Sequence, residues 1–163
     1  MYIGSSPHNF SGLFGRRPKA LARIKGSEEY KDITGTVWFY ESPVGVLTVA
    51  DIKGLPTQNG TCKGGVFGFH IHGGASCESK GEEDFDQTEG HYDPEDCEHP
   101  HHAGDMPPLF ENNGSAFLAF TSNRFSIDEI IGRTVVIHSG SDDFITQPAG
   151  NAGKKIACGE IKG

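Results

Sequence analysis

Short stretches of alternating apolar and polar residues recur along this chain, and each predicts a β-strand whose side chains point alternately to two faces. Residues 46–52 alternate most clearly, because Val46, Ala50 and Ile52 fall on one face. The other predicted strands cover residues 19–25, 32–41, 66–72, 116–121, 134–138 and 155–161. Many of their residues are β-branched or aromatic, as is typical of strands.

Turn-forming residues separate these stretches. Pro43-Val44-Gly45 and Asn112-Asn113-Gly114 predict tight turns, and Ser126 to Glu129 can cap a short helical turn. The segment 73–109 has no period and is rich in Asp, Glu, Gly, Pro and His. About eight short strands with long connections predict an all-β fold, a Greek-key sandwich or barrel of antiparallel strands.

The composition agrees with one such domain. The chain has 163 residues, with 23 Gly, 9 Pro and 35% apolar residues, which favours short strands and turns over long helices. Residues 1–18 are rich in Ser, Gly, Pro and Arg and predict an N-terminal arm, either mobile or held to the body by Phe10 and Phe14. The domain then covers residues 19–163.

Charge and hydropathy exclude several kinds of partner. The formal net charge is −8 and basic runs are short, which argues against a nucleic-acid partner. No apolar stretch approaches the length of a membrane span. The N-terminus shows no basic region followed by an apolar core, so we expect a cytoplasmic protein, with export by a leader missing from this sequence as the alternative.

The histidines are placed like metal ligands. His70 and His72 follow an apolar run, and on a strand they point to the same face, roughly 7 Å apart. His138 ends the predicted strand 134–138. The other candidates lie in the long segment without a period, and they are His91, His99, His102 and Asp105.

A single histidine is usually structural, but this set as a whole favours a metal site. Imidazole suits zinc and copper, and a carboxylate can complete a zinc site. Six histidines and one aspartate are enough for two ions, so we expect a double centre. Because the long segment carries four of these ligands, we also expect metal to order it.

Several motifs together resemble the copper/zinc superoxide dismutase family, in that family's order and over residues 19–163. They are Gly68-Phe-His-Ile-His72, Gly90-His-Tyr-Asp-Pro94, His102-Ala-Gly-Asp-Met-Pro107, Ile131-Gly-Arg-Thr-Val-Val-Ile-His138 and Gly150-Asn-Ala-Gly-Lys-Lys-Ile-Ala-Cys-Gly159. The resemblance implies the Greek-key β-barrel of that family.

The resemblance also implies the ligand sets. Copper would be held by His70, His72, His91 and His138, and zinc by His91, His99, His102 and Asp105. His91 would bridge both ions through its two ring nitrogens, which must then lose both protons. Asp142 matches the family carboxylate that accepts ring N–H bonds from His70 and His99 and orients them. His101 and His8 have no role in this scheme.

Four cysteines occur, and none forms a C-x-x-C pair. Cys77 and Cys158 match the family disulfide, which would be unusual in a reducing cytosol. Cys62 and Cys97 have no counterpart in the family pattern. They either form a second bridge or stay free, and a free Cys97 would lie two residues from His99.

The match departs from the family pattern near the substrate. Lys155 stands where the family usually has an anion-guiding arginine, and lysine keeps the charge but loses the planar fork of donors. The loop 139–154 is short and lacks the family's cluster of lysine and glutamate, and the segment 78–89 is strongly acidic. These departures put the rate in question rather than the metal ligands.

The resemblance implies an enzyme, a superoxide dismutase that converts superoxide to O₂ and hydrogen peroxide at copper, with His91 and Lys155 taking part. The alternative is a superoxide-dismutase-like metal-binding protein with little turnover. A third interpretation is a sandwich stabilised by zinc alone, which the complete copper set argues against. The expected partner is superoxide, a small anion, and the sequence leaves monomer and homodimer open.

Overall fold

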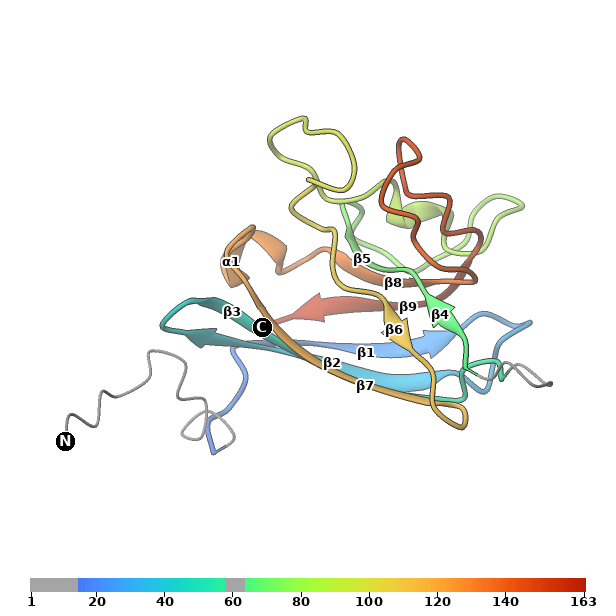
Figure 1. Cartoon of the computed structure of the whole chain (residues 1–163), viewed down its shortest axis with the longest axis horizontal. Coiled ribbons are helices and arrows are strands. Elements are labelled where there is room, and N and C mark those ends of the chain that lie inside the picture. Colours follow the sequence, from blue (N-terminus) through green and yellow to red (C-terminus); the bar gives the residue numbers. More distant parts are fainter. Residues whose placement is uncertain (1–14, 58–63) are drawn as a thin grey trace.

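A seven-stranded antiparallel sheet that curls on itself forms the body of the protein (Figure 1). The structure is a computed structural model and describes residues 15–57 and 64–163. Most of the predicted arm, including His8, Phe10 and Phe14, lies outside the described residues, and so does Cys62. In spatial order the strands are β5 (Phe69–His72), β8 (Thr134–His138), β9 (Lys155–Lys162), β1 (Ala20–Gly26), β2 (Thr34–Ser42), β3 (Gly45–Lys53) and β7 (Ser115–Ser122).

The main core fills the concave side of this sheet. The predicted alternation of β3 is confirmed, since Val46, Ala50 and Ile52 are buried in the main cluster. Two residues of β3 that point to the opposite face, Leu47 and Val49, are apolar as well. They form a separate buried cluster on the outer face of the sheet. The predicted turns are confirmed as well, because Ser42 pairs with Gly45 and Asn112 with Ser115.

The segment 66–72, predicted as one strand, is two strands. β4 (Val66–Phe67) pairs with β6 (Leu109–Phe110) in a small second sheet, and β5 begins after Gly68 in the large one. Gly68 N donates to Gly140 O at 2.7 Å and Gly68 O accepts from His138 N at 2.8 Å. A side chain at Gly68 would lie 2.8 Å from the Ala152 side chain, so only glycine lets the chain change sheets here.

Two long loops lie together at one end of the large sheet (Figure 1). The first runs from β5 to β6 and contains the short helix η1 (Asp86–Thr88), and the second joins β8 to β9. Cys77 of the first loop is bonded to Cys158 of β9 through a disulfide, as the family resemblance implied.

The helical turn predicted after Ser126 is α1 (Ile127–Ile130), and the Glu129 carboxylate accepts from Ser126 N at 2.7 Å. No helix in the described part of the chain has the length and apolar character to span a membrane.

Replacing Cys77 and Cys158 together by serine should lower the free energy of unfolding by about 4 kcal/mol, because the bond restricts the unfolded chain. The bonded residues are 81 positions apart. Denaturant unfolding of the metal-free protein measures the change. Cys97→Ser is the control, since Cys97 is exposed and free and its loss should leave stability unchanged. Equal stability of the bonded and double-serine proteins would contradict the prediction.

Candidate metal centre

Six histidines and one aspartate, far apart in the sequence, meet where the two loops cross the end of the sheet. They form two groups in which the candidate ligand atoms lie within 4.8 Å of one another. One group is His70, His72, His91 and His138, and the other is His91, His99, His102 and Asp105. These are the two predicted sets, and His91 belongs to both.

The backbone fixes this convergence. His70 and His72 lie on β5, opposite Val136 and Thr134 of β8. The first loop returns alongside β5 and forms two isolated antiparallel β-bridges with it. His91 pairs with His72, and Asp105 pairs with His70. Because the loop passes so closely, a Cβ at Gly104 would collide with the carbonyl oxygen of Ile71. Glycine at position 104 therefore allows the close approach that places His91 and Asp105 of the loop beside His72 and His70 of the strand.

In the first group, each histidine other than His91 has one ring nitrogen bonded to an oxygen outside the group. His70 Nε2 lies 2.7 Å from Asp142 Oδ2, His72 Nδ1 lies 2.8 Å from Glu89 O, and His138 Nδ1 lies 3.3 Å from Gly153 O. These acceptors hold the proton on the outer nitrogen and leave a lone pair on the inner one. His72 Nε2 and His138 Nε2 lie 3.2 Å apart.

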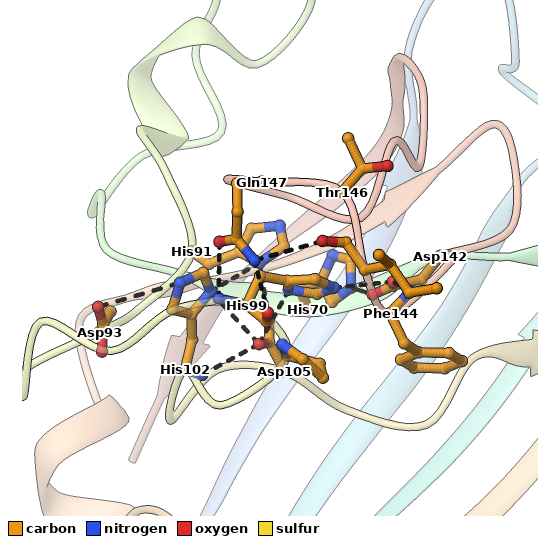
Figure 2. Close-up of polar contacts among 12 residues, drawn as sticks. His70, His91, Asp93, His99, His102, Asp105, Asp142, Phe144, Thr146 and Gln147 are labelled. Atoms are coloured by element: carbon orange, nitrogen blue, oxygen red, sulfur yellow. Dashed lines mark hydrogen bonds and ion pairs between the residues drawn. The ribbon is translucent and has the colours of Figure 1, made fainter.

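The second group surrounds the Asp105 carboxylate (Figure 2). Asp105 Oδ1 lies 2.7 Å from His91 Nδ1, and Asp105 Oδ2 lies 3.0 Å from His99 Nδ1. His102 Nδ1 completes the group at 3.3 Å from Asp105 Oδ2. His99 Nδ1 is buried, and despite its closeness to Asp105 it is not aligned for a hydrogen bond. Three nitrogens and one carboxylate oxygen that converge in this way fit a tetrahedral zinc site.

Buried atoms without partners mark the positions where metal fits. Within residues 15–57 and 64–163, six buried side-chain atoms lack a hydrogen bond, and three of them are histidine ring nitrogens: His70 Nδ1, His91 Nε2 and His99 Nδ1. Burying polar nitrogens in this way costs free energy unless something binds them. All three belong to the two groups, so the donor set fits one ion in each.

The protonation states of the site suit metal binding. Burial lowers the pKa of His70 and His72 and brings that of His138 to about 3, so these rings stay neutral. Burial alone would raise the pKa of Asp105 and Asp142. Hydrogen bonds and attraction from the neighbouring histidines, with the Phe144 amide added at Asp142, together outweigh burial and lower the pKa of both. Neutral imidazole and ionised carboxylate are the forms that bind metal ions.

Asp142 connects the two groups. It is buried, and its two oxygens accept from His70 Nε2 at 2.7 Å and from His99 Nε2 at 2.9 Å. Phe144 N also donates to Oδ1 at 2.7 Å, which holds the carboxylate in place (Figure 2). The two contacts with His70 and His99 are those that the resemblance led us to expect for Asp142.

Lys155 lies in the cavity that leads to the first group. This cavity of about 800 Å³ is lined by His72, His91 and His138 together with Lys155. The Lys155 ammonium donates to the carbonyl oxygens of Phe85 and Glu89, at 3.3 and 3.2 Å. Burial lowers the pKa of Lys155, while nearby acidic residues oppose that shift. The wall also carries Glu82, Glu83, Asp84 and Glu89.

Two arginines that the sequence analysis did not single out support the ligand loop. Arg133 lies over the ring of Tyr92, 3.9 Å from its centroid, and donates to Gly73 O at 3.0 Å. Arg124 donates to Pro100 O at 2.8 Å. Both bind backbone or ring atoms beside ligands, and no local pattern in the sequence signals such contacts. His101 is exposed and lies outside both groups.

A curled antiparallel sheet whose loops bring two four-ligand groups together on one shared histidine defines a dinuclear metal-binding protein of the β-barrel class. Residues 33–161 match the family model of copper/zinc superoxide dismutase (SODC). The chain therefore belongs to the copper/zinc superoxide dismutase family.

Individual relatives agree. The chain is 35% identical over 136 residues to superoxide dismutase [Cu-Zn] of Legionella pneumophila, covering 78% of this chain and 77% of that one. It is 33% identical over 167 residues to superoxide dismutase [Cu-Zn] 2 of Aquifex aeolicus, covering 93% and 91%. Among solved structures, a SOD-like protein from Bacillus subtilis matches with a TM-score of 0.71 and 26% identity, over 86% of this chain and 96% of that one. A double mutant of a SOD-like protein from the same organism gives 0.72 and 28%, over 88% and 97%.

Asp105→Ala should remove zinc before copper, because Asp105 is the carboxylate in the second group and does not belong to the first. Loss of a ligand and its contacts should lower zinc affinity by about 10-fold or more. Metal analysis after dialysis of the copper- and zinc-loaded protein measures this. Glu95→Ala is a matched control, since Glu95 is an exposed acid of the same loop. Unchanged zinc content in Asp105→Ala would reject the role of Asp105.

Proposed function

We propose that this protein is a superoxide dismutase, with copper held by His70, His72, His91 and His138 and zinc by His91, His99, His102 and Asp105. The shared histidine carries the proposal. His91 Nδ1 lies 2.7 Å from Asp105 in the second group, while its Nε2 is buried and has no hydrogen-bond partner among the described residues. A ring with one nitrogen toward each group suits a bridge between two ions.

When bound, copper supplies the one-electron chemistry that converts superoxide to O₂ and hydrogen peroxide, and zinc holds the bridging ring. The residues of the chain supply the geometry. The acceptors at Asp142, Glu89 O and Gly153 O keep the outer nitrogens of the copper-group rings protonated and the inner ones free to bind. Because these rings are buried and held from outside, they would keep their arrangement with a metal bound.

His91 is also placed to handle a proton. Peroxide formation needs two protons, and one donor must lie beside the reacting oxygen. His91 lines the cavity, and its Nε2 has no hydrogen-bond partner in the described chain, so it can take up and release a proton. Asp105 lies 2.7 Å from Nδ1, the nitrogen that zinc would bind, and so keeps the ring turned with Nε2 toward the first group.

The substrate is a small anion, and the entrance must admit it. Lys155 places a positive charge in the cavity beside His138, its pairing partner across β8 and β9. A cation in a cleft raises the local concentration of an anion. We therefore assign Lys155 the guiding role.

The acidic wall favours one alternative, a superoxide-dismutase-like protein that binds the metals and turns over slowly. Carboxylates at Glu82, Glu83 and Asp84 line the same cavity as Lys155 and oppose the approach of an anion. The compartment stays a prediction, cytoplasmic from the N-terminal sequence, although the disulfide favours the exported alternative.

The proposal is tested by reconstitution with copper and zinc. We expect two ions per chain and rapid consumption of superoxide, and His91→Ala should reduce activity by at least about 100-fold because both ions lose a ligand. His101→Ala is the matched control, since His101 is exposed and lies outside both groups. Full activity in His91→Ala would reject the bridge. Two bound ions with no turnover in the wild type would favour the alternative.

The role of Lys155 is tested by charge. Lys155→Glu should lower the rate by about 10-fold or more at equal copper content, whereas Lys155→Arg should keep or raise it. Lys162→Glu makes the same change in net charge at the exposed end of β9 and should have little effect. Steady-state superoxide consumption measures all three variants. Equal rates in the Glu and Arg variants at position 155 would show that Lys155 does not guide the substrate.

A further inference from the structure

The peptide groups of His99 are bound by one side chain from the other loop. Gln147 Oε1 accepts from His99 N at 2.9 Å, and Gln147 Nε2 donates to His99 O at 2.7 Å (Figure 2). The primary amide therefore pairs with the backbone of a single residue, as a neighbouring strand would. His99 belongs to the zinc group and does not belong to the copper group.

The loop that presents Gln147 is itself fixed. The Asp143 carboxylate accepts from Ile145 N, Thr146 N and Thr146 Oγ1, at 2.9, 2.8 and 2.6 Å. Gly150 N donates to Thr146 O at 2.7 Å and closes the turn behind Gln147. Gly150 has a φ of +65°, and a Cβ there would collide with the Asp142 carboxylate, so the loop can pass close to His99 only with glycine at this position.

The zinc ligand needs such support because its own segment has no regular structure. Between η1 and β6 the chain forms neither a helix nor a named strand. The ring of His99 is held by Asp142, through Nε2 at 2.9 Å, but a ring contact alone leaves the backbone free to shift. Gln147 holds that backbone from the same loop that carries Asp142.

We propose that Gln147 is a positioning residue for zinc, which holds the backbone of His99 so that its Nδ1 stays directed at the other zinc ligands. The proposal rests on the zinc site of the proposed function. The two bonds connect the first loop to the second at the zinc group, so their loss should speed the release of zinc and leave copper in place. Gln147 is exposed, so replacing it leaves the core intact.

The experiment compares the wild type with Gln147→Met, which keeps the length of the side chain and removes both hydrogen bonds. The copper- and zinc-loaded proteins are mixed with an excess of a zinc-binding dye, and the release of each metal is followed. We expect zinc to leave about 10-fold faster from Gln147→Met, with copper release unchanged. Ile145→Gln is the matched control, because this side chain is 79% exposed on the same loop.

A second measurement separates positioning from general stability. Thermal unfolding of the metal-free Gln147→Met protein should match that of the wild type, because the bonds act on a loop outside the core. Equal zinc release from wild type and Gln147→Met would overturn the proposal. Faster release of both metals together with weaker metal-free folding would overturn it as well, since the residue would then be structural. A wild type that retains no zinc would instead reject the zinc site of the proposed function.

Discussion

A buried imidazole can bind a metal through one nitrogen only if its other nitrogen is satisfied, and this constraint shapes the whole end of the molecule. The acceptors come from the two long loops: Asp142 and Gly153 O from the second, and Glu89 O from the first. The strands alone could bring His70, His72 and His138 together, but they could not orient the rings. The length of the loops therefore follows from the hydrogen bonds that the ligands need.

The same constraint makes the loops dependent on the sheet. A loop without regular structure holds a ligand only if its ends and middle are anchored, because each free residue costs conformational entropy. The disulfide Cys77–Cys158 anchors the first loop to β9, and close approaches at Gly68 and Gly104 join both loops to the strands. Three buried ring nitrogens in the two groups have no hydrogen-bond partner among the described residues, and binding of metal there would stabilise the folded state.

A period of two reports burial on one face and made strands such as β1 predictable, with its bounds one residue off. The strand 134–138 is buried on both faces, and its apolar, β-branched residues placed it without error. The change of sheets at Gly68 was not predictable, because the apolar run continues across it and a strand boundary inside such a run leaves no pattern. The two ligand groups followed from motifs of fixed spacing. Gln147 and Arg133 had no such signal, since their bonds to His99 and Gly73 depend on how separate segments meet.

Metal binding and turnover depend on different parts of this chain. The ligand geometry is set by buried contacts, such as the two bonds of Asp142, which surface charge hardly changes. The rate with an anionic substrate depends on the cavity entrance, where the Lys155 ammonium is held by two carbonyl groups and faces an acidic wall. A chain with net charge −8 already repels an anion at long range, so the local balance at this entrance decides the encounter. In the proposed function, the complete ligand sets therefore hold the metals, while a few charges at the entrance set how fast superoxide is consumed.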